Sequence, residues 1–413
     1  MKAGGEWRLG PPWGPAARRL AVALLAASAL ATGAAWYGGG VQAGPPQRPP
    51  PAFYRLPDPL PLPEGAPGQL IRVTRIAGPA SPPGAQAWAI LYHSRSADGR
   101  DVAVSGLVVA PSPRRGRAPA GGRPVVAWAH ATAGLADRCA PSRRGLPGLR
   151  AFGRSWLARL LDRGYVVVAT DYEGLGTPGV HPYLVGESEA HSILDAVRAA
   201  GQLRGAGAGG RVALWGFSQG GHAVLWAGQL APSYAPELRL TGLVSVSPGG
   251  ALAALDRDPF HPEPLRTTEF GVLIAAAWHE VYDAPLDILT PAGRAAAERL
   301  LSACPGSNQG GEPALAQDPR DVGPWRDLFA SNAPGRARVD APVLVVQGGA
   351  EGTAPTAVVR ALTARLCGLG GRPRLSLYPG VHHGKVMETS GPDVLAWIDA
   401  RLAGTLAGSS CPA

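Results

Sequence analysis

Residues 211–226 read RVALWGFSQGGHAVLW, and this stretch decides the fold. It begins as an apolar strand, continues as Gly216-Phe217-Ser218-Gln219-Gly220, and ends as the start of a helix. A serine on so tight a strand-to-helix turn takes a strained backbone conformation, and flanking glycines avoid the clash that neighbouring Cβ atoms would cause. Such a turn lifts the hydroxyl out of the sheet and points the helix N-terminus at it. The stretch therefore predicts Ser218 as a nucleophile.

The G-x-S-x-G pattern is short enough to occur by chance in a chain with 57 glycines, so its context carries the inference. Apolar, mostly Val-rich segments alternate with helical segments on both sides of it. The expected strands are 70–76, 87–94, 101–109, 124–130, 165–170, 212–215, 242–247, 342–347 and 374–378. The expected helices are 155–163, 187–203, 355–366 and 392–402. This alternation is typical of an α/β fold with a mostly parallel sheet and helices on both faces.

The sequence also divides into segments. Residues 1–43 resemble a signal peptide, because Arg18-Arg19 precede an apolar run of about 16 residues and Val41-Gln42-Ala43 suits a cleavage site. A retained N-terminal anchor is the alternative, although about 20 residues are needed to span a membrane. Residues 44–68 form a Pro-rich lead-in, expected to be draped on the surface or flexible.

A helical cap is expected at 249–338, inserted into a core made of 69–248 and 339–413. About 90 residues without a Val-rich strand are too many for a structureless loop in a compact domain. Thr267-Thr268-Glu269 and Thr290-Pro291 are helix-start signals. The first helix, to Tyr282, is apolar on nearly every face. Two interpretations of this apolar helix are open: it is buried inside the insert, or it is a lid that lines a lipid-binding channel.

The composition of the chain favours a globular protein. Hydrophobic residues make up 46% and charged residues 17% of the 413 residues, which allows a large core. The formal net charge is +9, but the basic residues after the leader are scattered and not clustered with aromatic residues. We read the charge as solvated surface and expect no nucleic-acid partner; binding to nucleic acid or to an anionic cell envelope is the alternative.

A serine nucleophile needs a base and an acid that orients the base. In this fold they follow in the order serine, acid, histidine, each after a strand. His383 is the preferred base, since it follows the last strand and Gly384 suits the turn; His382 is the alternative. Glu351 is the only carboxylate in the loop after 342–347. Alternatives for the acid are Asp256 and Asp258.

The backbone N–H groups of Gln219 and Thr132 are the expected oxyanion donors, with Ala131 as the alternative to Thr132. The Thr132 hydroxyl is a further donor in this prediction. His130, at the end of a strand, is expected to order the oxyanion loop, and His222 is expected to pack behind the site. The spacing of Cys and His residues fits no metal site, and we expect no cofactor.

Cys139, Cys304, Cys367 and Cys411 all follow the leader. An even number of cysteines in an exported protein favours disulfides, and four allow three pairings; buried free thiols are the other reading.

Five segments together resemble the secretory lipase family of fungi and actinobacteria. They are AWAHATAGLADRCAPS, GYVVVATDYEGLGTPGVHPYLVGESEAHSILDAVRAA, WGFSQGGHAVLWAGQLAPSYAPELRLTGL, PVLVVQGGAEGTAPTAVVRAL and YPGVHHGKVM. The resemblance covers about residues 70–402. It implies an α/β-hydrolase fold, secretion and hydrolysis of carboxylic esters without a metal. It also implies bridges Cys139–Cys304 and Cys367–Cys411, and a structural role for Asp171.

The resemblance assigns Ser218 as nucleophile and His383 as base, and it places Glu351 where the family commonly has Asp. The expected substrate is a small-molecule or lipid ester, and transient contact with a lipid interface fits the apolar cap. Two other functions remain open at this point: a peptidase or amidase on the same scaffold, and a lipid-binding envelope protein without catalysis.

Overall fold

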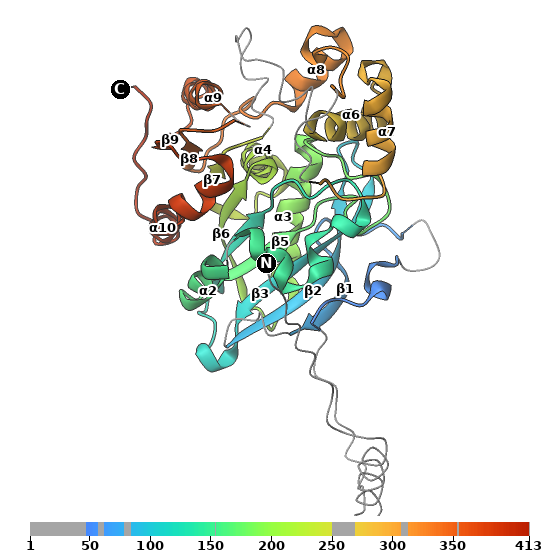
Figure 1. The fold of residues 1–413 in the computed structure, drawn as a ribbon. Coiled ribbons are helices and arrows are strands. Elements are labelled where there is room, and N and C mark those ends of the chain that lie inside the picture. The colour runs from blue at the N-terminus through green and yellow to red at the C-terminus, as the bar shows by residue number, and fades with distance from the viewer. Residues whose placement is uncertain are drawn as a thin grey trace, which may run out of the picture. The chain divides into compact units, whose positions relative to one another are not determined.

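A nine-stranded sheet runs through the described part of the chain in the order β1-β2-β3-β5-β4-β6-β7-β8-β9 (Figure 1). The structure is a computed structural model and describes residues 47–56, 62–77, 84–152, 154–249, 269–306, 313–352 and 355–412. The strands are β1 Leu70–Ile76, β2 Ala85–Arg95, β3 Asp101–Pro111, β4 Arg123–Ala129, β5 Val166–Thr170, β6 Ala208–Phe217, β7 Arg239–Val246, β8 Val343–Gly348 and β9 Pro373–Tyr378.

The sheet changes character along its width. From β5 through β4, β6, β7 and β8 to β9 all neighbours are parallel, whereas β1, β2 and β3 pair antiparallel and β3 joins β5 antiparallel. Parallel strands end at one common edge, so the loops after β4, β6, β7, β8 and β9 lie on the same side of the sheet. The expected α/β architecture with a mostly parallel sheet is confirmed.

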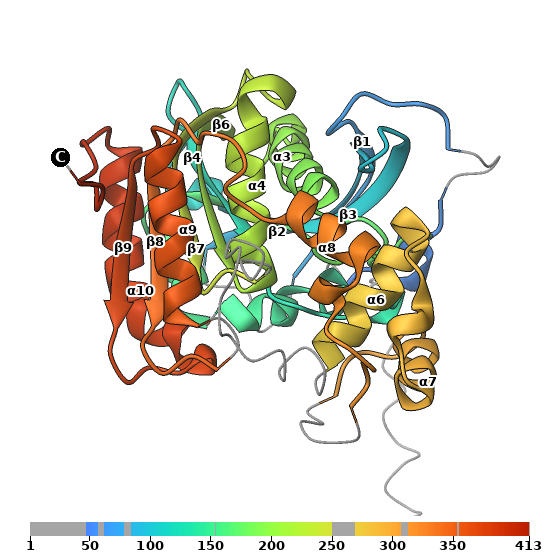
Figure 2. The ribbon, with the colours of Figure 1, turned by 90° about the horizontal axis from the view of Figure 1, so that it is seen from above.

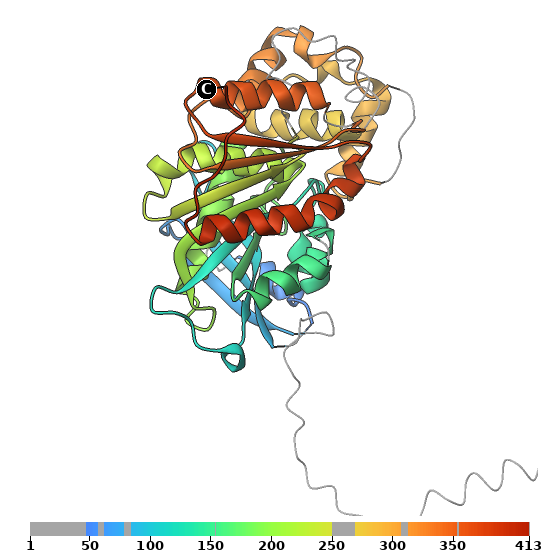
Figure 3. The ribbon, with the colours of Figure 1, turned by 90° about the vertical axis from the view of Figure 1, so that its left-hand side faces the viewer.

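Helices cover both faces of the sheet. One hydrophobic cluster holds the inward faces of α3 Gly186–Gln202, α4 Gln219–Tyr234 and α9 Thr356–Gly368. The other holds α2 Arg154–Asp162 and α10 His383–Leu402. Figure 3 shows α9 and α10 on opposite sides of β8 and β9. Neighbouring residues of β4, such as Ala127 and Trp128, enter different clusters because side chains alternate across a strand.

The largest difference between a predicted and an observed helix boundary is at the start of α10. α10 begins at His383, nine residues before the expected start at Pro392, which lies inside the helix. Proline usually marks the first turn of a helix, because its missing N–H is harmless there. Buried residues on both sides of Pro392, among them Val386 and Ile398, hold the longer helix against the sheet.

The described residues between β7 and β8 form the α-helices α6 Glu269–Tyr282, α7 Pro291–Leu300 and α8 Gly323–Asn332 (Figure 2). They share a third hydrophobic cluster, in which Trp278 of α6 stacks on Trp325 of α8. Thr290 caps α7 as its sequence predicts, accepting a hydrogen bond from the Gly293 N–H. Residues 271–278 of α6 are all buried, which accounts for its apolar surface.

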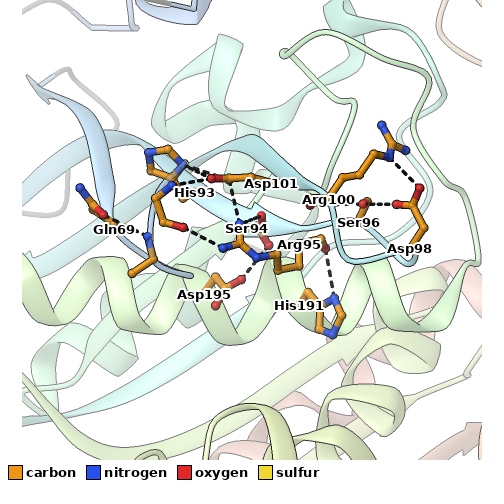
Figure 4. Close-up of polar contacts among 12 residues, drawn as sticks. Gln69, His93, Ser94, Arg95, Ser96, Asp98, Arg100, Asp101, His191 and Asp195 are labelled. Atoms are coloured by element: carbon orange, nitrogen blue, oxygen red, sulfur yellow. Dashed lines mark hydrogen bonds and ion pairs between the residues drawn. The ribbon is translucent and has the colours of Figure 1, made fainter. Parts of the chain in front are cut away.

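The described part of the lead-in contacts the core at several places. Phe53 and Tyr54, in a short 3-10 helix Pro51–Tyr54, are buried in the same cluster as α2 and α10. Further along, the Gly65 N–H donates to a carboxylate oxygen of Asp101 at 2.6 Å. Figure 4 shows Asp101 between His93 and Arg95, with Asp195 of α3 beside Ser94. The described part of the lead-in is therefore draped on the core.

Two disulfides are present, Cys139–Cys304 and Cys367–Cys411, which is the pairing implied by the resemblance. The first joins the loop after β4 to the segment after α7, and the second joins α9 to the C-terminal tail. Among the described residues, no helix has the length and apolar character needed to cross a membrane. The expected signal peptide lies outside the described residues.

Candidate active site

Ser218 stands alone between β6, which ends at Phe217, and α4, which begins at Gln219. Its φ of 55° and ψ of −114° place a non-glycine residue in a strained conformation, as the sequence predicts for a nucleophile turn. The flanking glycines are required by close backbone approaches. A Cβ on Gly216 would collide with the carbonyl oxygen of Gly220, and a Cβ on Gly220 would collide with that of Ala129.

Hydrogen bonds hold the Ser218 backbone in this conformation. Its N–H donates to the Val246 carbonyl at the end of β7 (2.9 Å), and its carbonyl accepts from the N–H groups of His222 (3.1 Å) and Gly249 (2.9 Å). The residue is 8% exposed. The turn is thus fixed by the end of β7, by Gly249 in the segment after it and by the first turn of α4.

The loops after β8 and β9 bring Glu351 and His383 together. His383 Nδ1 donates to Glu351 Oε2 at 2.8 Å. The Glu351 side chain is fully buried, whereas the His383 side chain is 23% exposed. The His383 ring also packs against the ring of Phe217, the residue before Ser218, at 4.8 Å between centroids. A histidine oriented through Nδ1 by a buried carboxylate has its Nε2 available as a base.

The alternatives to this pair lie elsewhere. His382 Nδ1 lies 3.0 Å from the carbonyl oxygen of Ala350, and no carboxylate contact of His382 is found among the described residues. Asp256 and Asp258, the alternative acids, fall outside the described residues. Geometry thus favours Glu351 and His383 within the described part of the chain.

Ser247 is a site residue that the sequence reasoning missed. Its hydroxyl donates to Glu351 Oε1 at 2.5 Å, so both carboxylate oxygens have a donor. Ser247 is fully buried and has a φ of 42°, a left-handed value that is uncommon for serine. Its position directly after β7, at the edge where the parallel strands end, was the available signal.

The loop after β4 holds the second expected oxyanion donor. The Thr132 hydroxyl, expected as a further donor, is engaged with the Tyr183 hydroxyl at 2.8 Å. His130 Nδ1 lies 2.7 Å from the Ala131 carbonyl oxygen, and the His130 carbonyl accepts from the Tyr172 hydroxyl at 3.2 Å. These contacts match the ordering role expected of His130.

Asp171 directly follows β5 and is fully buried. Its carboxylate accepts hydrogen bonds from Ser105 Oγ (2.6 Å), from the Ser142 N–H (2.8 Å) and from Ser142 Oγ. Burial raises the pKa of Asp171, opposed by these hydrogen bonds. The contacts connect strand β3, the segment after β4 and the segment after β5, which fits a structural role.

The side chain of Gln219 enters a buried polar network behind the turn, together with His181, Glu189 and His222. His222 faces Glu189 and the carbonyl of Asn332, so it lies behind the site as expected. Neither this network nor any other group of three or more His, Cys, Asp or Glu side chains among the described residues is placed to hold a metal ion.

Comparison with known proteins agrees with this architecture. The model of the secretory lipase family matches residues 152–258. Lipase A of Moesziomyces aphidis is 42% identical over 20% of this chain and 17% of its own length. The secreted triacylglycerol lipase LIP7 of Malassezia globosa is 28% identical over 67% of this chain and 64% of its own length. The matches thus cover less than two thirds of these curated relatives.

Solved structures extend the comparison to the fold. The closed state of Candida antarctica lipase A superposes with a TM-score of 0.74 and 18% identity, covering 88% of this chain and 89% of that chain. The rice cell wall degrading esterase LipA of Xanthomonas oryzae gives a TM-score of 0.64 at 19% identity, covering 82% and 99%. The resemblance to secretory lipases is confirmed, and the fold is that of the α/β-hydrolases.

Proposed function

We propose that this protein is a secreted serine hydrolase of carboxylic esters, a lipase or esterase, with Ser218, His383 and Glu351 as its triad. The observation that carries the proposal is the 2.8 Å hydrogen bond from His383 Nδ1 to the buried Glu351, at the same sheet edge as the strained Ser218 turn. The similarity to lipases and esterases supports the reaction class.

In the proposed reaction His383 Nε2 removes the Ser218 proton as Oγ attacks the acyl carbon of the ester. Glu351 keeps the imidazole oriented and stabilises its positive charge. The N–H groups of Gln219 and Thr132 bind the oxyanion of the tetrahedral intermediate. His383 then protonates the departing alcohol, and a water molecule activated by the same base hydrolyses the acyl-serine.

The proposal also assigns roles to the insert between β7 and β8 and to the N-terminal leader. Residues 249–338 act as a cap that buries the acyl chain of the substrate. The protein makes transient contact with a lipid interface while it takes up a lipid ester. Residues 1–43 act as a signal peptide. Cleavage after Ala43 would leave an exported chain that begins at Gly44, and N-terminal sequencing of the secreted protein tests this.

A fluorophosphonate probe tests the nucleophile directly. We expect labelling of the exported protein at a single site, identified as Ser218 by peptide mass analysis, and loss of p-nitrophenyl ester hydrolysis in Ser218→Ala. Ser233→Ala, an exposed serine in the same helix α4, is the control and should label and hydrolyse as the wild type does.

The same preparation separates the competing functions. Faster turnover of aminoacyl anilides than of esters would favour a peptidase or amidase. Lipid binding without labelling, unchanged in Ser218→Ala, would favour a non-catalytic carrier and overturn the proposal.

A further inference from the structure

A network of buried polar side chains lies directly behind the Ser218 turn. Its members come from three elements and from one loop, and none is more than 6% exposed: His181, Glu189, Gln219, His222 and Asn332. Burial of so many polar groups is costly unless each finds hydrogen-bond partners. The proposed reaction uses only one of these residues, Gln219, and only through its backbone N–H.

The Gln219 side chain is held at two points. Its Nε2 donates to Glu189 Oε1 at 2.8 Å and to His181 Nε2 at 2.7 Å. His181 can accept there because its Nδ1 donates to the Glu173 carbonyl at 2.8 Å. Burial lowers the pKa of His181 to about 3, so its ring is neutral near pH 7. The orientation of the Gln219 amide is therefore set by its two acceptors.

Glu189 is the centre of the network. One carboxylate oxygen accepts from Gln219 and from the Leu184 N–H (3.0 Å), and the other lies 2.8 Å from His222 Nδ1. The second ring nitrogen of His222 donates to the Asn332 carbonyl at 2.8 Å. His222 is therefore hydrogen-bonded through both ring nitrogens, to Glu189 of α3 and to Asn332 of α8. Two side chains in the first turn of α4, Gln219 and His222, are thus hydrogen-bonded to Glu189 of α3.

Asn332 extends the network to the helices between β7 and β8. It is in the last turn of α8, and its carbonyl also accepts from Trp226 Nε1 of α4 (3.0 Å). Its side-chain oxygen accepts from the Tyr282 hydroxyl of α6 (3.1 Å) and from the Gly186 N–H at the start of α3 (3.2 Å). One residue therefore joins α3, α4, α6 and α8.

We propose that Glu189, through the Gln219 side chain and His222, positions the oxyanion donor at the N-terminus of α4 and ties it to the helices between β7 and β8. This inference rests on the proposed function. An oxyanion donor stabilises the transition state only when it is fixed before the reaction, and small misplacements are costly. Glu189 touches no reacting atom, so it is a positioning residue.

Two variants remove the hydrogen bond between Gln219 and Glu189, each by changing one of the two residues. Gln219→Leu keeps the backbone N–H but loses both side-chain hydrogen bonds, and Glu189→Leu removes their acceptor. We expect kcat to fall about 10- to 100-fold in each, with KM changed less than about threefold, because the donor acts mainly in the transition state. Affinity for a boronic acid, whose serine adduct mimics the tetrahedral intermediate, should fall by about the same factor as kcat/KM.

A conservative variant and a matched control separate positioning from stability. In Glu189→Gln the amide oxygen can still accept from Gln219 and Leu184, and the amide N–H can donate to His222 Nδ1, so we expect activity close to that of the wild type. Asp195→Leu removes another buried carboxylate from the same helix, away from Gln219. It should lower the melting temperature without lowering kcat in the folded fraction.

The outcomes distinguish this inference from the proposed function. Normal kcat and boronate affinity in folded Gln219→Leu would overturn the positioning role, even if Glu189→Leu fails to fold. An equal loss of kcat in Asp195→Leu would overturn it as well. Absence of phosphonate labelling at Ser218 in the wild type would instead overturn the proposed function itself.

Discussion

Ser247 holds the side chain of Glu351, the proposed catalytic acid, in place through a hydrogen bond. The Glu351 side chain is fully buried, and burial of a polar group is costly unless the group is hydrogen-bonded. The donors found among the described residues are the His383 ring and the Ser247 hydroxyl, one on each oxygen. Hydrogen bonds to charged groups contribute more than neutral ones, typically about 1.5–3 kcal/mol.

We therefore predict that Ser247→Ala lowers kcat about tenfold or more, because Glu351 then holds His383 less firmly. Steady-state ester hydrolysis measures this. Ser94→Ala is the control: Ser94 is also fully buried and also donates to a carboxylate, Asp195 Oδ2 at 2.8 Å, but in the cluster of Figure 4. An unchanged kcat in Ser247→Ala, or an equal drop in Ser94→Ala, would contradict the assigned role.

A site residue could be predicted from the sequence where its residue type suits the reaction and its place after a strand suits the site. Ser218 stood in a recognisable turn, and Glu351 was the only carboxylate in its loop. Ser247 and Asn332 could not be found in this way. Serine and asparagine are common loop residues, and their roles depend on which distant segments the fold brings to them.

At the scale of elements, α3 presents two buried carboxylates, Glu189 near Ser218 and Asp195 near the β2–β3 hairpin. Asp195 accepts hydrogen bonds from Ser94, Arg198 and Tyr234. Burial nevertheless raises its pKa from 3.8 to about 6. The folded protein therefore holds a proton that the unfolded chain releases between about pH 4 and pH 6.

This shift has a defined consequence for stability. The stabilisation from protonated Asp195 is fully present below about pH 4 and is lost as the pH rises through about 6, by roughly 3 kcal/mol. We predict that the wild type loses unfolding free energy relative to Asp195→Asn over this range, because the asparagine does not titrate. Urea unfolding of both proteins at pH 4, 5, 6 and 7 measures the difference; a constant difference would contradict the prediction.

The elements themselves were largely predictable, because Val-rich runs and helix-start signals repeat along the chain. The exceptions are α8, for which no helix was expected, and the start of α10, where Pro392 was read as a helix start. Local rules treat proline as a boundary, but burial of the helix on both sides of it outweighs the local cost in this case. Packing of this kind becomes visible only in the tertiary structure.

At the scale of the whole molecule, the two disulfides constrain the chain very differently. Cys139–Cys304 closes a segment of 165 residues that contains the Ser218 turn and the helices α6 and α7, whereas Cys367–Cys411 closes 44 residues near the C-terminus. A cross-link stabilises mainly by lowering the entropy of the unfolded chain, and the effect grows with the logarithm of the loop length.

The loop lengths give an order of stability that can be measured. The entropy model gives about 5 kcal/mol for the long loop and about 4 kcal/mol for the short one. We predict that the double variant Cys139→Ala/Cys304→Ala loses more unfolding free energy than Cys367→Ala/Cys411→Ala, by about 1 kcal/mol. Guanidinium unfolding of both variants and the wild type, without reductant, provides the comparison. A larger loss in the Cys367–Cys411 variant would mean that pinning the tail across β9, where the Ser410 N–H donates to Pro373 at 2.8 Å, matters more than chain entropy.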